Sequence, residues 1–531
     1  MAKTVDAQTL KRWLHDGGEI ALLDVREHGQ FGESHLFYAI PLPYSRLELE
    51  VARLVPRRGT RTVVYDAGDA STPLVAERAA ARLLALGYTD VSLLQGGTRA
   101  WAEAGFKLFA GVNLPSKTFG ELAELAYHTP KLSADRLAEM LVQPEPPVVL
   151  DGRPVAEFHK MNIPGAICCP NGELALRVHR LVPDPATTIV INCAGRTRSI
   201  IGAQTLINLG VPNPVYALEN GTQGWFLADH KLAHGGTQRF ADDSADPVLR
   251  SAALALAQRF AVPGVDAATC LAWAGDASRC LFLCDVRTPE EFAAGSLPGA
   301  QHTPGGQLMQ STDQYVGVRG ARLVLFDDDG VRAPTVASWL RQMGHEACVL
   351  EHGLASALAL ASTEPAAPLP LQTIDAAALA VRLNQRDALV IDLRDGMLFR
   401  AGHIQGSRWS IRPRLDDLLQ DAMKAGVKQI VLVCDEPALA GWTAASEWPA
   451  GLPAPLRLTG GMADWCVAGL PIVPSPDEPS DADCIDYLFF VHDRHAGNKE
   501  AARRYLAWET GLVEQLDAQE LAGFSLPHMA P

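Results

Sequence analysis

One unit occurs four times along this chain of 531 residues, and its internal spacing is constant. Each copy contains an apolar run that ends in Asp-x-Arg and a second apolar run that ends at an Asp or a Cys. These two positions lie 42 residues apart in every copy: Asp24 and Asp66, Asp151 and Cys193, Asp285 and Asp327, Asp392 and Cys434. A spacing that persists in otherwise divergent sequence indicates duplication of a folding unit. We therefore predict four tandem domains of one architecture, named unit 1 to unit 4.

Within each copy, runs typical of buried strands alternate with segments of helical periodicity. A phenylalanine follows the Asp-x-Arg segment, then comes a turn such as 162–166 or 296–300, and a glycine-containing turn such as 95–101 closes the copy. Strands that alternate with helices form a parallel sheet covered on both faces. Such sheets bind ligands at the carboxyl ends of their strands. We therefore predict an α/β fold with a ligand loop at this edge of each sheet.

The overall composition is that of an ordinary globular protein, with 48% hydrophobic and 20% charged residues. A formal net charge of −15 argues against a broad surface for nucleic acid or an anionic membrane, and we expect neither partner. No apolar run approaches the length of a membrane span, and the first residues lack the apolar core of a signal peptide. Ten cysteines without a repeated C-x-x-C spacing argue against a disulfide framework or a zinc site. We expect a cytoplasmic protein with no metal and no cofactor.

Cys193 is the strongest candidate for a functional residue. The apolar run 189–192 places it at the end of a strand, and the loop 194–198 leads into a segment of helical periodicity. Backbone N–H groups at the start of a helix bind anions, and Arg196 and Arg198 add positive charge. These features favour the thiolate over the thiol. A buried structural cysteine is the alternative, but two arginines within five residues favour a reactive group.

Periodicity lapses between the copies, which sets the predicted domain boundaries. We assign domains to residues 1–110, 126–236, 262–361 and 371–475, followed by an extension at 476–531. Apolar and aromatic residues of the extension predict one or two amphipathic helices: Tyr487, Leu488, Phe489, Tyr505, Leu506, Trp508, Leu512 and Leu516. We expect this segment to pack against a domain or against a second chain, with solvated disorder as the alternative.

These marks together resemble the rhodanese (thiosulfate sulfurtransferase) family. The Asp-x-Arg segment, the Ile-Pro-Gly-Ala turn, an active loop at a strand end and the closing Gly-Gly-x-x-x-Trp turn recur in that order. The chain is similar to bacterial proteins with four tandem rhodanese-like domains. The resemblance covers the four units and omits the linkers and the extension. It implies that each domain is a parallel five-stranded sheet flanked by helices, with a C-terminal helical extension after the last one.

The resemblance implies an enzyme of the thiosulfate sulfurtransferase type that uses Cys193. Its thiolate would attack the outer sulfur of thiosulfate, release sulfite and hold a persulfide until cyanide, a thiol or an acceptor protein takes the sulfur. The implied substrate-binding residues are Ala194, Gly195, Arg196, Thr197, Arg198 and Ser199. Their N–H groups and hydroxyls would hold the anionic sulfur, and the arginines would bind the donor and the leaving sulfite. The loop departs from the Cys-Arg-x-Gly and Cys-Gly-Ser/Thr-Gly patterns of the family, which leaves the donor open.

The other three units are predicted to be weaker than unit 2. Asp66 and Asp327 stand in the position of the cysteine, so units 1 and 3 cannot carry a persulfide. In unit 4, two acidic residues and no arginine follow Cys434, which raises the pKa of a thiol. In unit 3, a cation site formed by the three aspartates at 327–329 is the alternative to a purely structural role.

Five further residues of interest lie outside the loop. Cys168 and Cys169 are candidates to receive sulfur from Cys193 or to resolve an oxidised form, with core packing as the alternative. Glu173 is expected at the mouth of the same site. The segment 492–495 contains two histidines, but a solvated helix end explains it better than a metal site does.

Two other functions compete with sulfur transfer. Protein phosphatases also hold a thiolate between a strand and a helix, but their loop has five residues between cysteine and arginine. Here four residues separate Cys193 from Arg198, which leaves a ring sized for a smaller group such as a sulfane sulfur. The second alternative is a non-enzymatic persulfide carrier or scaffold in a sulfur relay, in which the weakened units serve as docking surfaces.

Overall fold

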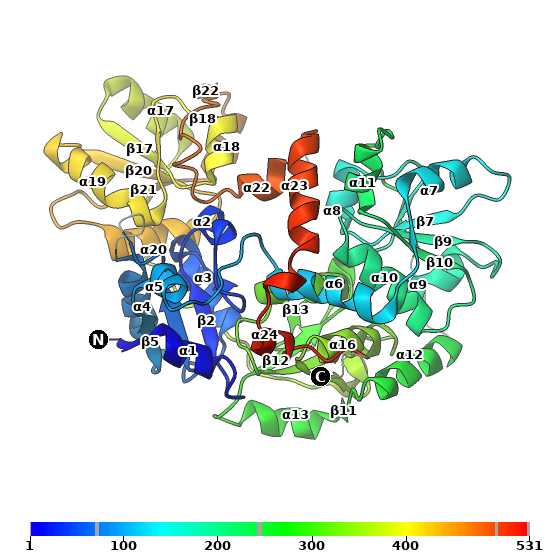
Figure 1. Cartoon of the computed structure of the whole chain (residues 1–531). Helices are drawn as coiled ribbons and strands as arrows, with labels where there is room; N and C mark the ends of the chain where they lie inside the picture. The colour runs from blue at the N-terminus through cyan, green and yellow to red at the C-terminus, as the bar shows by residue number, and fades with distance from the viewer. Residues whose placement is uncertain (1, 70–73, 242–246, 494–496, 528–531) are drawn as a thin grey trace.

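A computed structural model describes residues 2–69, 74–241, 247–493 and 497–527 (Figure 1). It contains four five-stranded parallel sheets with one shared strand order, in which the fifth and fourth strands lie between the first and the second. The order in unit 1 is β1-β5-β4-β2-β3, and that in unit 2 is β6-β10-β9-β7-β8. The predicted α/β architecture of four repeated units followed by a helical extension is confirmed.

Units 1 and 2 have the same sequence of strands and helices. Unit 1 comprises β1 (Lys3–Val5), α1 (Ala7–Trp13), β2 (Ala21–Asp24), α2 (His28–Glu33), β3 (Ile40–Pro41), α3 (Leu47–Leu54), β4 (Thr62–Tyr65), α4 (Val75–Ala85), β5 (Val91–Leu94) and α5 (Gly97–Glu103). Unit 2 comprises β6 (Lys131–Leu132), α7 (Ala134–Leu141), β7 (Val148–Asp151), α8 (Val155–Lys160), β8 (Ile167–Cys168), α9 (Leu174–Leu181), β9 (Ile189–Asn192), α10 (Thr197–Asn208), β10 (Val215–Leu218) and α11 (Gly221–Leu227).

Units 3 and 4 repeat this pattern with small changes. Unit 3 comprises β11 (Gly264–Val265), α13 (Ala267–Ala274), β12 (Leu281–Asp285), α14 (Pro289–Ala294), β13 (Gln301–His302), α15 (Gly305–Gln310), β14 (Arg322–Phe326), α16 (Arg332–Gln342) and β15 (Glu346–Leu350). Unit 4 comprises β16 (Thr373–Ile374), α17 (Ala376–Gln385), β17 (Ala388–Asp392), α18 (Gly396–Ala401), β18 (His403–Ile404), β19 (Arg408–Trp409), α19 (Leu415–Lys424), β20 (Gln429–Val433), α20 (Pro437–Glu447), β21 (Leu456–Leu458), α21 (Gly461–Val467) and β22 (Ile472–Val473).

Strand β9 illustrates how the sequence places the candidate nucleophile. All four of its residues are buried, as expected for a parallel strand covered by helices on both faces. It pairs with β7 on one side and with β10 on the other. The chain leaves the sheet at Cys193 and turns into α10, so this residue lies at the carboxyl edge of a central strand.

The Asp-x-Arg segment forms the same buried ion pair in all four units. The Nη2–Oδ2 distance is 2.6 Å for Arg26–Asp24 and 2.7 Å for each of Arg153–Asp151, Arg287–Asp285 and Arg394–Asp392. Each arginine also donates to a backbone carbonyl eight residues further along the chain, such as that of Met161 in unit 2. The pair therefore fastens a strand end to the turn that follows it, in units with and without a cysteine.

The units pack against one another through buried polar and apolar contacts. Units 1 and 3 share one hydrophobic core. Between units 1 and 4, Arg412 Nη1 lies 2.5 Å from Glu48 Oε2. Between units 2 and 3, Arg332 Nη1 lies 3.1 Å from Glu173 Oε1. Glu173 is therefore buried in this interface. Its expected place at the mouth of the site is wrong, because Arg332 of unit 3 and Arg177 of unit 2 bind its carboxylate inside the protein.

The segments between and after the units are largely helical. Two linkers carry α6 (Leu114–Tyr127) and α12 (Pro247–Arg259), and the extension carries α22 (Phe489–His492), α23 (Lys499–Thr510) and α24 (Ala518–Leu521). Figure 1 shows the extension, in orange and red, running from unit 4 through the centre of the molecule. It packs against this chain's own units: Lys11 binds Glu520 at 3.0 Å, and the Gly396 N–H donates to Asp486 at 2.7 Å.

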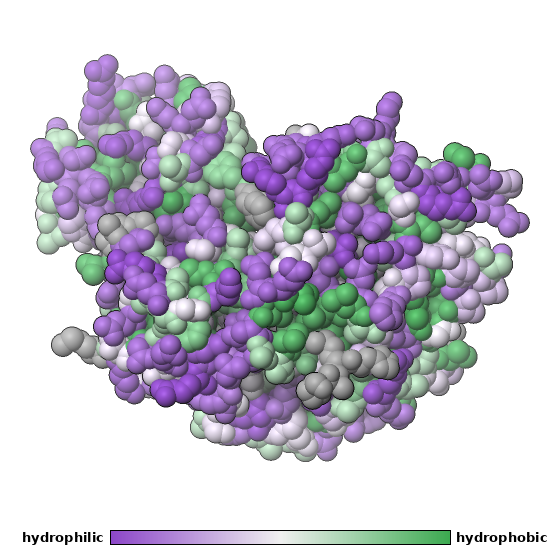
Figure 2. Space-filling model, in the orientation of Figure 1, coloured by the Kyte–Doolittle hydropathy of each residue, from purple (hydrophilic) through white to green (hydrophobic). Residues whose placement is uncertain are grey.

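Figure 2 shows mostly hydrophilic residues on this face, with apolar side chains gathered near its centre, where the extension and α6 run in Figure 1. Among the described residues, no helix combines the length and the apolar character that crossing a bilayer requires.

Candidate active site

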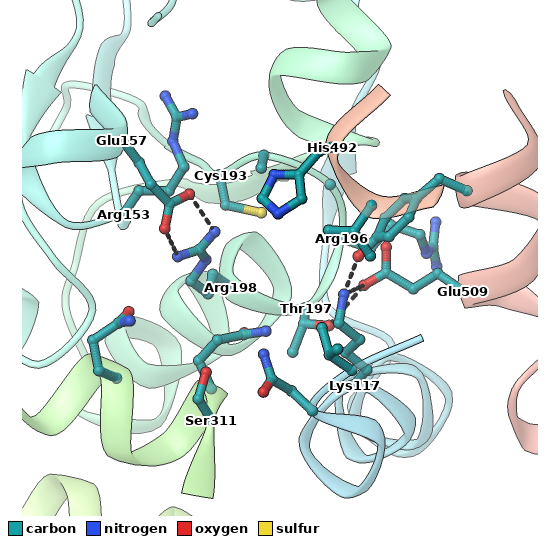
Figure 3. A pocket seen from close by; sticks show the side chains of 18 of the residues that line it. Lys117, Arg153, Glu157, Cys193, Arg196, Thr197, Arg198, Ser311, His492 and Glu509 are labelled. Carbon is teal, nitrogen blue, oxygen red and sulfur yellow. Dashed lines mark hydrogen bonds and ion pairs between the residues drawn. The ribbon is translucent and has the colours of Figure 1, made fainter. Parts of the chain in front are cut away.

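Cys193 lies in the wall of a cavity of about 360 Å³ and is only 2% exposed (Figure 3). Four separate parts of the chain line this cavity. Unit 2 contributes the loop from Cys193 to Arg198 together with residues of α8, and the first linker contributes Lys117. Unit 3 contributes Gln307, Gln310, Ser311 and Gln314, and the extension contributes Val491, His492, Tyr505 and Glu509. The site is therefore composite, although its candidate nucleophile, Cys193, belongs to unit 2.

The loop from Cys193 to Arg198 lines this cavity. The carbonyl of Cys193 accepts a hydrogen bond from the Thr222 N–H at 2.8 Å, and that of Ala194 accepts one from Gln223 Nε2 at 3.0 Å. These bonds come from the glycine-containing turn that closes unit 2, and they hold the loop carbonyls away from the cavity. Within the described residues, the N–H groups of 194–199 donate to no protein acceptor. The loop is thus an open cradle for an anion.

Gly221 is required for this close packing between the closing turn and the loop. Its φ is +55°, and a Cβ at this position would lie 2.3 Å from the carbonyl oxygen of Cys193. Any other residue would push the loop away from the turn. The glycine in the repeated motif therefore has a direct role in shaping the cradle.

Two hydroxyl groups predicted to belong to the site are present at the loop. Ser199 Oγ lies 3.6 Å from Cys193 Sγ and also 2.8 Å from the carbonyl oxygen of Arg196. Thr197 Oγ1 donates to Glu509 Oε1 at 3.0 Å, so it is already bonded to the extension. The structure brings Ser199 next to the sulfur and directs Thr197 to α23.

Both loop arginines are paired with carboxylates. Arg196 binds Glu121 through two hydrogen bonds of 2.7 and 2.8 Å and also contacts Glu124, both on α6. Arg198 binds Glu157 of α8 through two bonds of 2.8 Å (Figure 3). These partners raise the pKa of each guanidinium further, against the effect of burial. The arginines remain charged, but their charges are largely offset.

Several site residues come from outside the repeats, and the sequence did not identify them. Lys117 Nζ donates to the hydroxyl of Tyr505 and lies 4.6 Å from the centre of its ring and 5.1 Å from that of Trp508. Glu509 lies between Thr197 and this lysine. The aromatic residues of the amphipathic extension were the available signal, but they do not show which surface the helix covers.

In units 1 and 3 the equivalent cradle is filled by the protein itself. Asp327 Oδ1 accepts from the Gly330 N–H at 2.9 Å, and its Oδ2 accepts from Val331 at 3.1 Å and from Ala333 at 2.8 Å. Asp66 likewise accepts from the N–H groups of residues 68 and 76, at 2.8 and 3.0 Å. The aspartate carboxylate occupies the place that an anion would take.

The other two aspartates of unit 3 are bound to arginine. Asp328 and Asp329 pair with Arg332 at 3.0 and 2.6 Å, respectively. Among the described residues, no group of three His, Cys, Asp or Glu side chains has an arrangement that could hold a metal ion. The cation interpretation of 327–329 therefore has no geometric support. Of the histidine pair at 492–495, the second member lies outside the described residues.

The remaining cysteines near strand ends are buried. Burial, with a smaller contribution from Asp435, raises the pKa of Cys434 to about 11. The sequence predicted a raised pKa for this thiol, and the structure agrees, but burial is a larger cause than the acidic neighbours. Cys168 and Cys169 are fully buried in the cores of unit 2, and burial raises the pKa of Cys168 to about 12. This favours core packing for both.

Comparison with known proteins decides the family. A model of the rhodanese-like domain matches residues 6–104, 133–228, 270–359 and 375–468. The chain belongs to the rhodanese-like family. This confirms the resemblance inferred from the repeated motifs, and the predicted enzyme class, the rhodanese-type sulfurtransferases, is confirmed at the level of the family. A search of curated proteins finds no match.

Several solved structures are similar to this rhodanese-like chain. The crystal structure of a thiosulfate sulfurtransferase from Pseudomonas aeruginosa is 42% identical, with a TM-score of 0.90, and covers 99% of this chain and 100% of its own. A protein from Anabaena sp. is 28% identical with a TM-score of 0.19, and covers 20% of this chain and 93% of its own. A complex of an EanB variant with ergothioneine is 16% identical with a TM-score of 0.24, and covers 69% of this chain and 100% of its own.

Proposed function

We propose that the protein transfers a sulfane sulfur from thiosulfate to a thiophilic acceptor through a persulfide on Cys193. The Cys193 thiolate attacks the outer sulfur of thiosulfate and forms a new S–S bond. The bond to the sulfonate sulfur breaks, and its electron pair leaves with sulfite. An acceptor such as cyanide then attacks the outer persulfide sulfur and expels the Cys193 thiolate, which regenerates the enzyme.

The open cradle of unit 2 is the observation that carries this proposal. A strand-end thiol stands beside N–H groups that have no protein acceptor in the described structure, whereas the same groups in unit 3 are taken by Asp327. Oriented N–H groups stabilise both the persulfide anion and the charge that develops on the leaving sulfite. Unit 2 is thus the proposed catalytic domain, and units 1, 3 and 4 are proposed to support it.

The donor is proposed from two lines of support. The cavity borders on the cations Lys117, Arg153 and Arg198, which suits an anionic substrate even though the arginines have partners. The similar protein from Pseudomonas aeruginosa is a thiosulfate sulfurtransferase by name.

All ten cysteines are free, which fits a reducing compartment such as the cytoplasm.

Thiocyanate formation from thiosulfate and cyanide tests the proposal. We expect Cys193→Ala to abolish turnover and Cys434→Ala to leave it unchanged, because the unit 4 thiol is buried with a raised pKa. Intact-mass measurement should show the addition of one sulfur atom to the wild type and none to the Cys193 variant. A protein that gains the sulfur but gives no turnover with any small acceptor would be a persulfide carrier instead.

A further inference from the structure

One face of α15 and of the turn after it is polar and lines the cavity that contains Cys193. Every residue that unit 3 contributes to this cavity carries an uncharged amide or hydroxyl group: Gln307, Gln310, Ser311 and Gln314. Their separations from the first to the others, of three, four and seven residues, place them on one side of a helix. The other side is apolar, because Leu308 and Met309 belong to the core shared by units 1 and 3.

The polar side chains of this face have no partners in the protein. Within the described residues, none of the four makes a side-chain hydrogen bond. Gln307 and Gln310 are half-buried, and Gln314 is exposed. Polar groups that are partly withdrawn from water and lack a protein partner bind water or a ligand instead. The face is therefore available to a molecule in the cavity.

Packing between units 2 and 3 holds this face close to the loop that follows Cys193. At the start of α15, a Cβ on Gly306 would lie only 3.2 Å from the backbone nitrogen of Asn171 in unit 2. The side chain of Asn171 in turn donates to the carbonyl of Arg198 at 2.9 Å. At the end of α15, Gln310 borders a gap of about 10 Å³ together with Thr197 and Arg198. Both ends of the helix are thus near the loop.

The cavity has room for a molecule that reaches from this wall toward the thiol. Figure 3 shows Ser311 across the cavity from Cys193. At the ~30 Å³ that each water takes in the liquid, the cavity of about 360 Å³ holds roughly 12 heavy atoms. Thiosulfate has five heavy atoms, so a substrate larger than the sulfur donor fits.

The chemistry of the wall indicates what kind of substrate this is. A glutamine amide both donates and accepts hydrogen bonds. An amide group in a ligand does the same, so each partner can satisfy the other. Thiosulfate and cyanide have acceptor atoms only and would leave the glutamine oxygens without a donor. The wall carries no charge, so it does not select a charged ligand.

We propose that this face binds the sulfur acceptor, and that the acceptor is a small thiol with at least one amide group. This rests on the proposed function and specifies its second half-reaction. The acceptor loses its thiol proton to water, and its thiolate attacks the outer sulfur of the Cys193 persulfide. A new S–S bond forms, the bond to Cys193 breaks, and its electron pair leaves with the Cys193 thiolate. The acceptor departs as an alkyl persulfide, and Gln307 and Gln310 are specificity-determining residues.

Single-turnover sulfur transfer tests this assignment. Cys193 is loaded with thiosulfate, and intact mass follows the loss of the added sulfur after mixing with 2-acetamidoethanethiol or 2-mercaptoethyl acetate. The two thiols have the same number of heavy atoms, but an ester oxygen replaces the amide N–H in the second. We expect the wild type to react faster with the amide. Gln307→Met and Gln310→Met should each lower the amide-to-ester rate ratio about two- to tenfold, as expected for one hydrogen bond.

The control is Gln258→Met, at an exposed position of α12 that does not line the cavity. Its rate ratio should equal that of the wild type. Equal wild-type rates with the two thiols, or an unchanged ratio in both cavity variants, would overturn the acceptor assignment alone. So would variants that only raise the KM for thiosulfate, because the wall would then bind the donor.

The loading step separates this proposal from the one on which it rests. Failure of the wild type to load sulfur on Cys193 would overturn the proposed function and the acceptor assignment together. The extent of loading also reports whether each variant is folded, and either cavity variant alone is enough to decide the ratio.

Discussion

Units 2 and 3 have the same fold and the same kind of turn at the end of a central strand, but the side chain at the strand end is Cys193 in unit 2 and Asp327 in unit 3. In unit 2 a sulfur stands at the strand end and the N–H groups of the loop have no protein acceptor in the described structure. In unit 3 the carboxylate of Asp327 stands at the strand end and accepts hydrogen bonds from three of the equivalent N–H groups. An aspartate at this position thus does more than replace a thiol, because its carboxylate also takes up the loop N–H groups.

The surroundings of the two loops follow from this difference. The open loop of unit 2 is held by residues from outside the unit: Glu121 of α6 binds Arg196, and Glu509 of α23 binds Thr197. The loop of unit 3 is held by the carboxylate of its own Asp327. The loop arginine of this unit, Arg332, is buried and binds Glu173 of unit 2. Arg332 of unit 3 thus helps to hold units 2 and 3 together.

The largest expected effect comes from converting the open loop into the filled one. Cys193→Asp and Cys193→Ser should both abolish sulfur transfer, since neither side chain carries a persulfide. They should differ in anion binding, because only the aspartate can occupy the N–H groups as Asp327 does. We expect thiosulfate to bind the serine variant at least about tenfold more tightly than the aspartate variant, as measured by titration calorimetry. Equal affinities would show that the cradle is not the anion site.

A smaller effect concerns the filled loop and its dependence on pH. Burial and the neighbouring Asp329 raise the pKa of Asp327 from 3.8 to about 7, against the N–H bonds, which lower it. Between these two pH values the folded state holds a proton that the unfolded state releases, so this group makes the protein less stable as pH rises from about 4 to about 7. Asp327→Asn cannot titrate and removes this slope.

Thermal unfolding midpoints measured from pH 5 to pH 8 test this prediction. The midpoint of the wild type should fall relative to that of Asp327→Asn as the pH approaches 7, and the difference should level off above it. Parallel curves for the two proteins would mean that Asp327 is ionised across the whole range. Asp276→Asn, at a partly exposed position of the same unit where hydrogen bonds lower the pKa to about 2, is the control and should follow the pH dependence of the wild type.

The fold and the strand-end position of Cys193 were predictable because both are encoded locally. The strand run 189–192, the loop arginines and the closing turn lie within one repeat, and repetition made each pattern visible four times. The bracing of the loop was not predictable in the same way. Thr197 and Glu509 are separated by 312 residues, and an amphipathic helix shows that it has an apolar face without showing what the face covers.

The filled cradle could not be predicted from the sequence either. A carboxylate at position 327 is expected to repel an anionic donor, but its three hydrogen bonds to the loop depend on backbone geometry that no residue pattern shows. Glu173 was misplaced for a related reason, because its partner Arg332 belongs to another unit. In each case the sequence did not show a contact that arises when distant parts of the chain pack together.

The smallest effect concerns the charge that the open loop offers to a donor. Arg198 is held by Glu157, whose side chain is 40% exposed, so this pair is weaker than a fully buried one. Glu157→Gln removes the competing negative charge and leaves the guanidinium available to the sulfonate oxygens of thiosulfate. We expect the KM for thiosulfate to fall by a factor of about 1.4 to 5, which corresponds to the ~0.2–1 kcal/mol typical of such pairs.

Initial-rate measurements at varied thiosulfate concentration give this KM, and Glu139→Gln is the matched control. Glu139 pairs with Arg136 at 2.8 Å on exposed α7 of the same unit and does not line the cavity. A rise in KM for Glu157→Gln would reverse the interpretation, because it would mean that Glu157 holds Arg198 in its binding position rather than competing with the donor. In that case the open loop, like the filled one, would depend on a carboxylate for its shape, although in unit 2 this carboxylate comes from α8 and not from the strand end.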